Sequence, residues 1–367
     1  MTQYMHPDTT LSGPADFIAS LPGVLGYYPQ ESAVIMSLWL DDESGEPVLG
    51  PVLRTDLCHA GNLQDAVDEV DTHNAIGHMA VVVTRIPNSG LALDAVEALY
   101  ALKDAQGLAL VDVCWHVSEI APGTPYSLVF GPPPGELVTA GFGDDWVGGT
   151  VASVMQQPTM GALLAQGALP ELRKDDTRAF FDASCRGDQE AAASGAAHCY
   201  HLGDNLIEQL EANPSAARDL ALEACVDLAS APPHPLVGGA EHLRFDDVFT
   251  STQQMERVAT MLTRSQLRDS LFNTALDHPK EAGAVMLTIA RNFEGVIRAN
   301  ALSVWAVIAV KLKLANWASV ALMCAQEEVP GHSLSYILDQ LLRGGEHEGL
   351  LQSARSGCDA TWRDVLG

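Results

Sequence analysis

Short apolar runs separated by turn residues fill the first part of the chain, a pattern that is typical of an α/β domain. The clearest strand is Met79–Ile86, because so apolar a run usually lies inside a sheet that is covered on both faces. Further strands are predicted over Ser32–Leu40, Val48–Leu57, Leu108–Val117 and Tyr126–Phe130, and helices over Asp16–Leu21, Leu63–Thr72 and Ala92–Gln106. This order indicates a mixed, partly parallel sheet flanked by helices.

A segment rich in proline and glycine, Pro122–Gly149, ends this pattern and predicts a domain junction. We therefore expect an α/β domain over residues 1–147 and an all-α domain over residues 148–367, subdivided by a loop near 231–240. Apolar positions in the second half follow the helical period. They predict helices over 159–168, 175–186, 188–211, 215–229, 251–263, 264–277, 281–292, 297–312, 315–327, 332–343 and 346–354.

The C-terminal helices carry the pattern of a helical hairpin. Leu302 and Trp305 share one face of their helix, and the small residues Ala318 and Ala325 of the next helix allow close packing before Pro330. This resembles a single tetratricopeptide-type (TPR-like) hairpin. Because one such hairpin cannot bury its own apolar face, we expect it to pack on the helices before it.

The charge of the chain excludes several classes of function. A formal net charge of -27 repels phosphate, so we expect binding neither to nucleic acid nor to an anionic membrane. The longest apolar stretch, Ala299–Val310, is far shorter than the ~20 residues of a membrane span, and Met1–Thr10 has no feature of a secretory signal. The sequence therefore predicts a cytoplasmic protein whose acidity serves solubility or faces a basic partner.

Cysteine usage agrees with an intracellular location. The chain has 7 cysteines, an odd number, at wide spacings and with no CxxC pair, which argues against a disulfide framework and a zinc ribbon. We expect reduced thiols that are mostly buried. No cofactor is predicted.

The sequence lacks the familiar catalytic motifs. None of the five lysines follows a glycine, so a Walker-type phosphate loop is excluded, and no G-x-S-x-G elbow occurs. Gly141-Phe142-Gly143 is followed by two aspartates, which would repel a pyrophosphate, and we interpret it as a turn. The sequence leaves open whether the chain is an enzyme, and the lack of these motifs favours a protein without catalytic activity.

Two clusters of histidine and cysteine are candidate sites. His198 and His201 would share a helix face and form a weak metal candidate, which needs a further ligand such as Cys185 or Asp204. Helical histidines are more often structural, so we predict no metal. Cys114 and His116 point to one face of a strand, where a catalytic pair is conceivable. A core strand with a half-buried histidine is the favoured interpretation.

The strongest candidate for a ligand site lies around the first two strands. Tyr28 and Ser32 stand where the chain enters the first strand, and Arg54 and Asp56 alternate to the same face of the second. These residues would form either a binding site at the sheet edge or a structural ion pair that locks the hairpin. We favour the ion pair, because perturbed charge pairs are often structural.

Several ordered segments together resemble the DUF4192 family of uncharacterised actinobacterial proteins. They cover most of the chain: Ser12–Ser32, Leu53–Leu57, Pro158–Pro170 followed by Arg173, Pro330–Leu334 and Leu338–Gly344. The resemblance implies an α/β domain followed by a TPR-like helical part, with no established activity. Many members look cysteine-rich around the proline segment, whereas Gly131–Gly135 has no cysteine here, so this chain would lack any metal or redox site at that place.

Two functions remain. The leading hypothesis is a non-enzymatic interaction or scaffold protein that holds a protein partner with its helical half. The alternative is a small-molecule-binding protein or enzyme with its site at the carboxyl ends of the parallel strands. Acidic mimicry of nucleic acid is a third possibility. The oligomeric state is left open.

Overall fold

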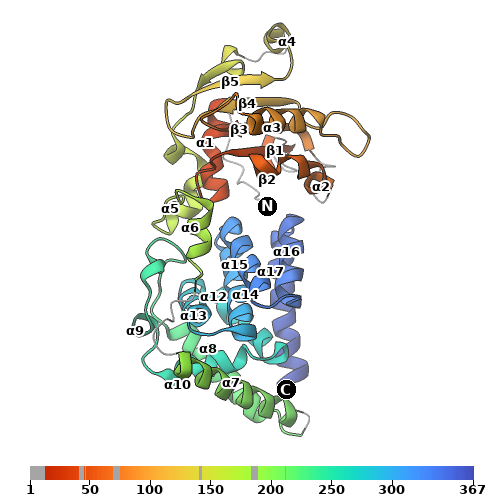
Figure 1. Cartoon of the computed structure of the whole chain (residues 1–367). Helices are drawn as coiled ribbons and strands as arrows, with labels where there is room; N and C mark the ends of the chain where they lie inside the picture. The colour runs from red at the N-terminus through yellow and green to blue at the C-terminus, as the bar shows by residue number, and fades with distance from the viewer. Residues whose placement is uncertain are drawn as a thin grey trace. The chain divides into compact units, whose positions relative to one another are not determined.

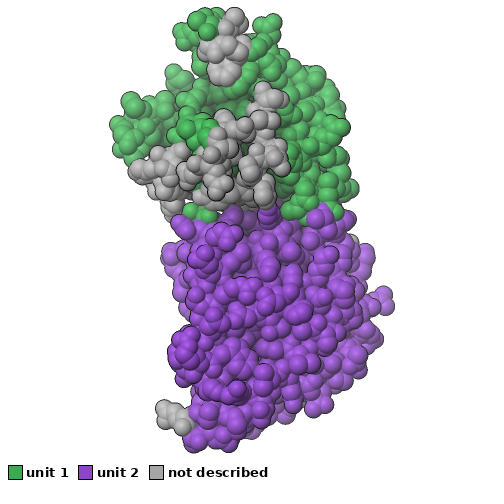
Figure 2. Space-filling model, turned by 180° about the vertical axis from the view of Figure 1, so that it is seen from behind, with its two compact units in different colours: residues 1–164, 169–174, 343–345 green, residues 165–168, 175–342, 346–367 purple. Residues whose placement is uncertain are grey.

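The protein is described from a computed structural model, which covers residues 13–40, 45, 47–68, 75–139, 143–182, 189–210 and 212–367. The chain divides into two compact units, drawn in two colours in Figure 2. The first, the α/β unit, comprises Met1–Leu164, Leu169–Lys174 and Arg343–Gly345. The second, the helical unit, comprises Ala165–Ala168, Asp175–Leu342 and Glu346–Gly367.

The α/β unit is built on a mixed sheet in the strand order β2-β1-β3-β4-β5-β6, of which Figure 1 labels β1 to β5. Strands β3 and β4 run parallel, and the other neighbouring pairs are antiparallel. The strands are β1 (Ser32–Leu40), β2 (Pro47–Asp56), β3 (Ala75–Val83), β4 (Val113–Val117), β5 (Pro125–Phe130) and β6 (Gly148–Thr150). The predicted fold class, a mixed sheet with flanking helices followed by a helical half, is confirmed.

Both faces of the sheet are buried, as the apolar strand at 79–86 predicted. One face carries Ala33, Ala80 and Cys114, which pack in a core cluster with residues of three helical segments. These segments are the 3-10 helix η1 (Leu57–Asn62), α2 (Leu63–Asp68) and α3 (Gly90–Ala101). On the other face the indole Nε1 of Trp115 donates to the carbonyl O of Trp146 at 2.8 Å. The 3-10 helix η2 (Asp144–Trp146) therefore helps to cover that face.

Residues 148–164, which we assigned to the helical domain, group with the α/β unit for two reasons. Strand β6 pairs with β5, and the 3-10 helix η4 (Pro158–Met160) packs on α1 (Pro14–Leu25). The hydroxyl of Thr159 donates to the carbonyl O of Ser20 at 3.0 Å, and a Cβ at Gly23 would lie 2.5 Å from the same hydroxyl. The remaining short segments of this stretch are α4 (Pro134–Thr139), η3 (Val154–Gln156) and α5 (Gly161–Ala165).

The segment before β4 differs from the prediction. The helix predicted over Ala92–Gln106 ends at Ala101, and the strand predicted from Leu108 begins only at Val113. The cause is a turn in which the Asp104 carboxylate accepts from the backbone N–H of Gln106 at 2.9 Å and of Leu108 at 2.8 Å. This local bonding competes with both the helix and the strand.

Two further helices end at other residues than predicted. Helix α1 runs past the predicted Asp16–Leu21 to Leu25, where Gly26 ends it in the left-handed conformation at φ 76° and donates to the carbonyl O of Pro22. The helix predicted over Leu63–Thr72 is α2, which ends at Asp68, and positions 69–72 lie outside the described residues.

The helical unit has helices at most of the predicted places, and its described residues contain no β-strand. The helix predicted over 175–186 is shorter, because it ends at Ala179 and residues 180–182 form a turn. The helix predicted over 159–168 is instead η4 followed by the five-residue α5, which belong almost entirely to the α/β unit. One short helix, α9, was missed because four residues carry too little periodicity. The helices are α6 (Lys174–Ala179), α7 (Gln189–Gln209), α8 (Ser215–Ser230), η5 (Ala240–His242), α9 (Phe245–Val248), α10 (Thr252–Met261), α11 (Ser265–Arg268), η6 (Asp269–Leu271), α12 (Phe272–Asp277), α13 (Pro279–Asn292), α14 (Gly295–Lys311), α15 (Ala315–Glu328), α16 (Ser333–Arg343), α17 (His347–Ala360) and the π-helical turn η7 (Thr361–Val365). Positions 183–186 of the helix predicted over 175–186 lie outside the described residues.

The core of this unit forms around α14, which is buried from Ile297 to Val310 and packs on α13 and α15. An aromatic pair just after α6 inserts into this core. Phe180 lies 5.0 Å from the ring of Trp317, and Phe181 lies 4.8 Å from the ring of Trp305. Edge-to-face contacts of this kind add to the burial of apolar area. In the described parts of the chain no helix is both long and apolar enough to span a bilayer.

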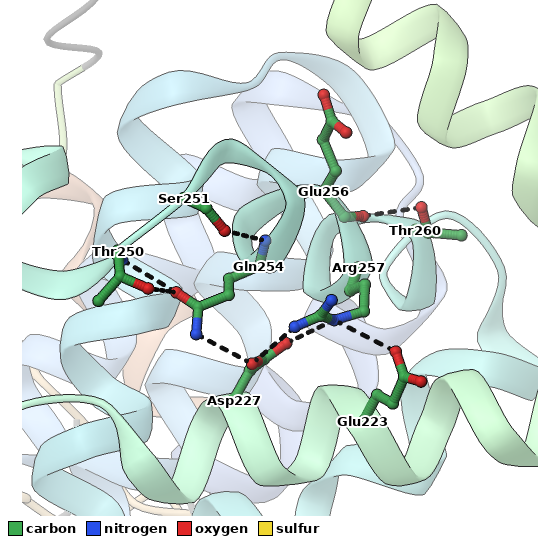
Figure 3. A network of polar contacts seen from close by, with 8 residues as sticks. All are labelled: Glu223, Asp227, Thr250, Ser251, Gln254, Glu256, Arg257 and Thr260. Atoms are coloured by element: carbon green, nitrogen blue, oxygen red, sulfur yellow. Dashed lines mark hydrogen bonds and ion pairs between the residues drawn. The ribbon is translucent and has the colours of Figure 1, made fainter.

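A partly buried ion pair ties α8 to α10 (Figure 3). The guanidinium of Arg257 donates to both carboxylate oxygens of Asp227, at 2.8 Å and 3.0 Å. Gln254 donates to the same carboxylate at 3.3 Å, and Glu223 lies 3.6 Å from Arg257. Because every member has a partner on the facing helix, this network holds helices together and leaves no open site.

Candidate functional site

The candidate site lies where the two parallel strands of the α/β unit end. Strand β3 ends at Val83 and β4 at Val117, and Ser32 at the start of β1 is the ladder partner of Val83. A cleft of about 270 Å³ opens beside these ends. Its lining residues are Tyr28, Pro29, Gln30, Glu31, Arg85, Ser118, Glu119, Ile120, Ala121 and Leu172. We call it the carboxyl-end cleft.

The loop before β1 forms one wall of this cleft and is fixed at Glu31. The Glu31 carboxylate accepts from the hydroxyl of Thr84 at 2.8 Å and from the backbone N–H of Arg85 at 3.4 Å. Its backbone is left-handed, at φ 42°, which costs on the order of 1–3 kcal/mol for a residue with a Cβ. The strain is maintained because the side chain bridges the end of β3, whose Thr84 N–H in turn donates to the carbonyl O of Val117.

A second chain segment closes the cleft. The backbone N–H of Tyr28 donates to the carbonyl O of Glu171 at 2.8 Å, and the Gln30 amide donates to the carbonyl O of Leu172 at 3.1 Å. These bonds hold the exposed Leu172 against the loop before β1. The exposed apolar side chain of Leu172 therefore contributes to the lining of the cleft.

The cleft rim carries an ion pair that is exposed to solvent. The Arg85 guanidinium lies 2.5 Å from the Glu119 carboxylate, and the two side chains are 77% and 50% exposed. Pairs this exposed contribute about 0–1 kcal/mol, so little opposes their opening. A bound molecule with a charged or polar group would exchange partners with them at little cost.

Arg54 organises the residues beside the cleft. Its guanidinium donates to the Ser32 hydroxyl at 3.0 Å and 2.7 Å and to the Asp56 carboxylate at 2.5 Å, and its side chain is only 9% exposed. It also lies 5.9 Å from the centre of the Tyr27 ring. Burial raises the pKa of Tyr27, which Arg54 opposes and Asp56 reinforces.

The four residues selected from the sequence are thus divided between two places. Ser32, Arg54 and Asp56 come together in one bonded group, which is the arrangement expected of an ion pair locking the β1–β2 hairpin. Tyr28 lines the cleft. The residues that sequence reasoning missed are Glu31, Arg85 and Glu119, and a signal for the last two exists, since each follows an apolar strand within two residues.

The Cys114–His116 pair does not form a reactive site. Cys114 belongs to the buried core cluster, and burial raises the pKa of its thiol, which disfavours the nucleophilic thiolate. His116 lies 2.9 Å through Nε2 from the carbonyl O of Thr84. A carbonyl can only accept, so Nε2 carries the proton. This histidine helps to hold the end of β3.

The His198–His201 pair lies on α7 with both side chains exposed, while Cys199 between them is buried and donates to the carbonyl O of Glu256. Asp204, one of the two further ligands considered, is paired with Arg264. The other, Cys185, lies outside the described residues. Over the residues that are described, no three histidine, cysteine, aspartate or glutamate side chains are arranged to hold a metal ion.

Comparison with known proteins places the chain in a family. The model of the family described as "Domain of unknown function (DUF4192)" matches residues 14–348, so the chain belongs to that family. No curated protein and no solved structure matches the chain. The family description names no function, so the geometry above is the basis for one.

Proposed function

We propose that the α/β unit binds a small molecule in the carboxyl-end cleft. The observation that carries the proposal is the position of the cleft, which opens beyond the carboxyl ends of β3 and β4. Open α/β sheets bind their ligands at this place, because the loops that leave parallel strands diverge there.

The composition of the lining also supports a ligand site. Pro29, Ile120 and Leu172 offer apolar surface, while Glu31 and the Arg85–Glu119 pair offer a few fixed polar groups. Small-molecule sites combine apolar walls with a small number of placed polar groups in this way. The lining carries no catalytic motif that we recognise in the sequence, so the proposal is binding and not a reaction.

The test is a methyl NMR screen of the full chain against a library of small compounds. We expect some compounds to shift the methyl signals of Ile120 and Leu172 and to leave that of the exposed Leu93 on α3 in place. The substitution Ala121→Trp, which fills the cleft, should abolish those shifts, whereas Leu93→Trp should preserve them. The proposal is contradicted if no compound shifts the cleft methyl signals, or if the compounds shift them equally in the wild type and in Ala121→Trp.

A second candidate function is protein binding by the helical unit, for which we keep the comparison of the α14–α15 hairpin with a TPR. The specific observation is on α8, where Leu222 and Val226 are 48% and 64% exposed. Because these positions are four residues apart, they form one apolar stripe on the helix surface. We further propose that the protein works in the cytoplasm of an actinobacterium.

A pull-down with paired baits tests this second function. A partner that is retained stoichiometrically by the wild-type chain should be lost from the double variant Leu222→Lys with Val226→Lys. A control bait with Tyr336→Lys, on α16, should keep it. Failure of the wild-type bait to retain any stoichiometric protein would count against the interaction function and leave the ligand proposal unaffected.

A further inference from the structure

The carboxyl-end cleft carries one cation and one anion that are accessible to a ligand. These are Arg85 and Glu119, which lie 2.5 Å apart at its rim. In the described part of the chain, neither side chain has another polar partner. The third charged residue of the lining, Glu31, is already committed, because its two carboxylate oxygens accept from Thr84 and from the backbone N–H of Arg85. A ligand therefore meets one guanidinium and one carboxylate, side by side.

These two neighbouring charges limit the class of ligand. A simple anion would pair with Arg85 and leave Glu119 without its partner, and a simple cation would do the reverse. A small zwitterion satisfies both residues at once, because its negative end faces the guanidinium and its positive end faces the carboxylate. In an α-amino acid, standard bond lengths and angles place the ammonium nitrogen about 2.5 Å from the carboxylate carbon. The opposite charges of the Arg85–Glu119 pair are similarly close.

The remainder of the lining fits an apolar side chain on that zwitterion. Pro29 and Ile120 are buried residues of the lining, and Leu172 is 71% exposed, so an apolar group that covers it removes apolar surface from water. Sites for drug-sized ligands measure roughly 300–1,000 Å³, so a cleft of about 270 Å³ suits a smaller molecule. Size and lining thus agree on a small ligand with an apolar part.

We propose that the ligand of the carboxyl-end cleft is a free α-amino acid with an apolar side chain. Its carboxylate accepts from the Arg85 guanidinium, and its ammonium group donates to the Glu119 carboxylate. Its side chain contacts Ile120 and Leu172. This inference rests on the proposed function, since it names the class of ligand for the same cleft.

The test compares leucine with two molecules that share its carbon skeleton, and it follows the methyl signals of the full chain by ¹³C NMR. The first analogue, 4-methylpentanoate, lacks the ammonium group, and the second, 3-methylbutylamine, lacks the carboxylate. We expect leucine to shift the Ile120 methyl signal and to bind roughly 10-fold or more tightly than either analogue, because each analogue leaves one member of the pair unmatched. Similar affinities for all three compounds would overturn the inference.

Glycine tests the apolar part of the inference. It carries the same two charged groups as leucine but has no side chain to contact Ile120 and Leu172. It should therefore bind roughly 10-fold or more weakly than leucine. Equal affinities for glycine and leucine would show that the apolar lining does not select the ligand, which contradicts the class that we assign.

Variants of the ion pair give a sharper readout. In Arg85→Gln the ligand carboxylate has no charged partner, so leucine should bind no more tightly than 3-methylbutylamine. In Glu119→Gln the ammonium has none, so leucine should bind no more tightly than 4-methylpentanoate. The control Arg178→Gln breaks an exposed pair with Glu327 in the helical unit and should keep the full preference for leucine. A preference that survives in both cleft variants, or that Arg178→Gln also abolishes, would overturn the inference.

The failure of this inference is distinguishable from the failure of the proposed function. If leucine leaves the cleft methyl signals in place while library compounds of another class shift them, only the amino-acid inference is wrong. If neither leucine nor any library compound shifts them, both are wrong. Circular dichroism checks the fold of each variant, and the comparison of ligands on the wild-type chain stands if a variant fails to fold.

Discussion

Two buried histidines, one in each unit, have opposite surroundings. In the helical unit, His332 donates through Nε2 to the Asn300 side-chain oxygen at 3.0 Å, and its Nδ1 accepts from the backbone N–H of Ser335 at 3.3 Å. Arg268 donates to the same Asn300 oxygen at 2.7 Å, and the Asn300 amide donates to the carbonyl O of Leu262. In the α/β unit, the Nε2 of His78 is buried without a partner.

The comparison shows that burial of a polar group does not by itself identify a site. The polar groups around His332 bond to one another and link the start of α16 to α14, as fully connected networks do. At the carboxyl ends of the parallel strands, by contrast, the Arg85–Glu119 pair is exposed to solvent and lines a cleft. Four changes test or sharpen this difference, in order of decreasing effect.

The largest effect is expected from Arg298→Ala in the helical unit. The buried Arg298 guanidinium donates to the carbonyl O of Phe181 at 2.7 Å and pairs with Glu328 at 3.2 Å. Its loss leaves the Phe181 carbonyl without this donor and the Glu328 carboxylate without its counter-charge, although Glu328 still accepts from the backbone N–H of Gly295. The free energy of unfolding, measured in urea, should fall by about 3–5 kcal/mol. Arg178→Ala, which removes an exposed pair with Glu327, is the control and should cost about 1 kcal/mol or less. Equal losses in the two variants would contradict the assigned structural role.

A pH effect should follow from His332. Burial, reinforced by Arg268, lowers its pKa to about 4 from 6.5. The unfolded chain therefore takes up a proton below about pH 6.5 that the folded chain takes up only near pH 4, so stability falls as the pH drops across this window. Replacing the histidine removes the contribution.

We expect the free energy of unfolding of His332→Gln to decline less between pH 6.5 and pH 4 than that of the wild type, because glutamine does not titrate. Glutamine can still donate to Asn300, which makes it the conservative replacement. Urea titrations at several pH values measure the difference, in which the titration of the shared carboxylates cancels. Parallel curves for the two proteins would show that His332 is not held neutral by the fold.

A smaller effect is expected at the β1–β2 hairpin. Arg54→Met should destabilise the α/β unit by about 1–3 kcal/mol, since the buried Ser32 hydroxyl and the Asp56 carboxylate lose a charged donor. Asp56→Asn should cost less, because the Asp56 side chain is 44% exposed and its amide still accepts from Arg54. If Arg54→Met is neutral for stability and alters ligand binding instead, the locking role is wrong and Arg54 belongs to the binding site.

The smallest effect on stability should come from the rim of the carboxyl-end cleft. Arg85→Gln breaks an ion pair with Glu119 in which both side chains are exposed, so the free energy of unfolding should change by less than about 1 kcal/mol. The compounds found in the methyl screen should nevertheless bind Arg85→Gln with altered affinity. A variant that melts much lower would show that the pair supports the fold, and unchanged affinities would place it outside the ligand site.

The sequence predicted the fold class because long apolar runs mark the elements that are buried on all sides, as in β3 and α14. It failed where a local hydrogen bond decided the backbone, since the carboxylate of Asp104 ends the preceding helix and delays β4 until Val113. Such a turn depends on one side chain and has no periodic signal.

The site could be predicted only in part. Tyr28 and the Arg54 group were selected from their places at strand ends, and they lie at the edge where the parallel strands finish. Glu31 could not be selected, because its role depends on its left-handed backbone and on two hydrogen bonds to the end of β3. One of these bonds is to Thr84, which lies 53 residues further along the chain. The orphaned Nε2 of His78 depends on packing from several segments and has no counterpart in the sequence.

The central claim is that the carboxyl-end cleft of the α/β unit is a binding site, and crystallographic fragment screening tests it most directly. The account predicts that fragments collect in this cleft, between Tyr28, Ile120 and Leu172. Fragments that bind only elsewhere, with this cleft filled by the protein's own side chains, would contradict it.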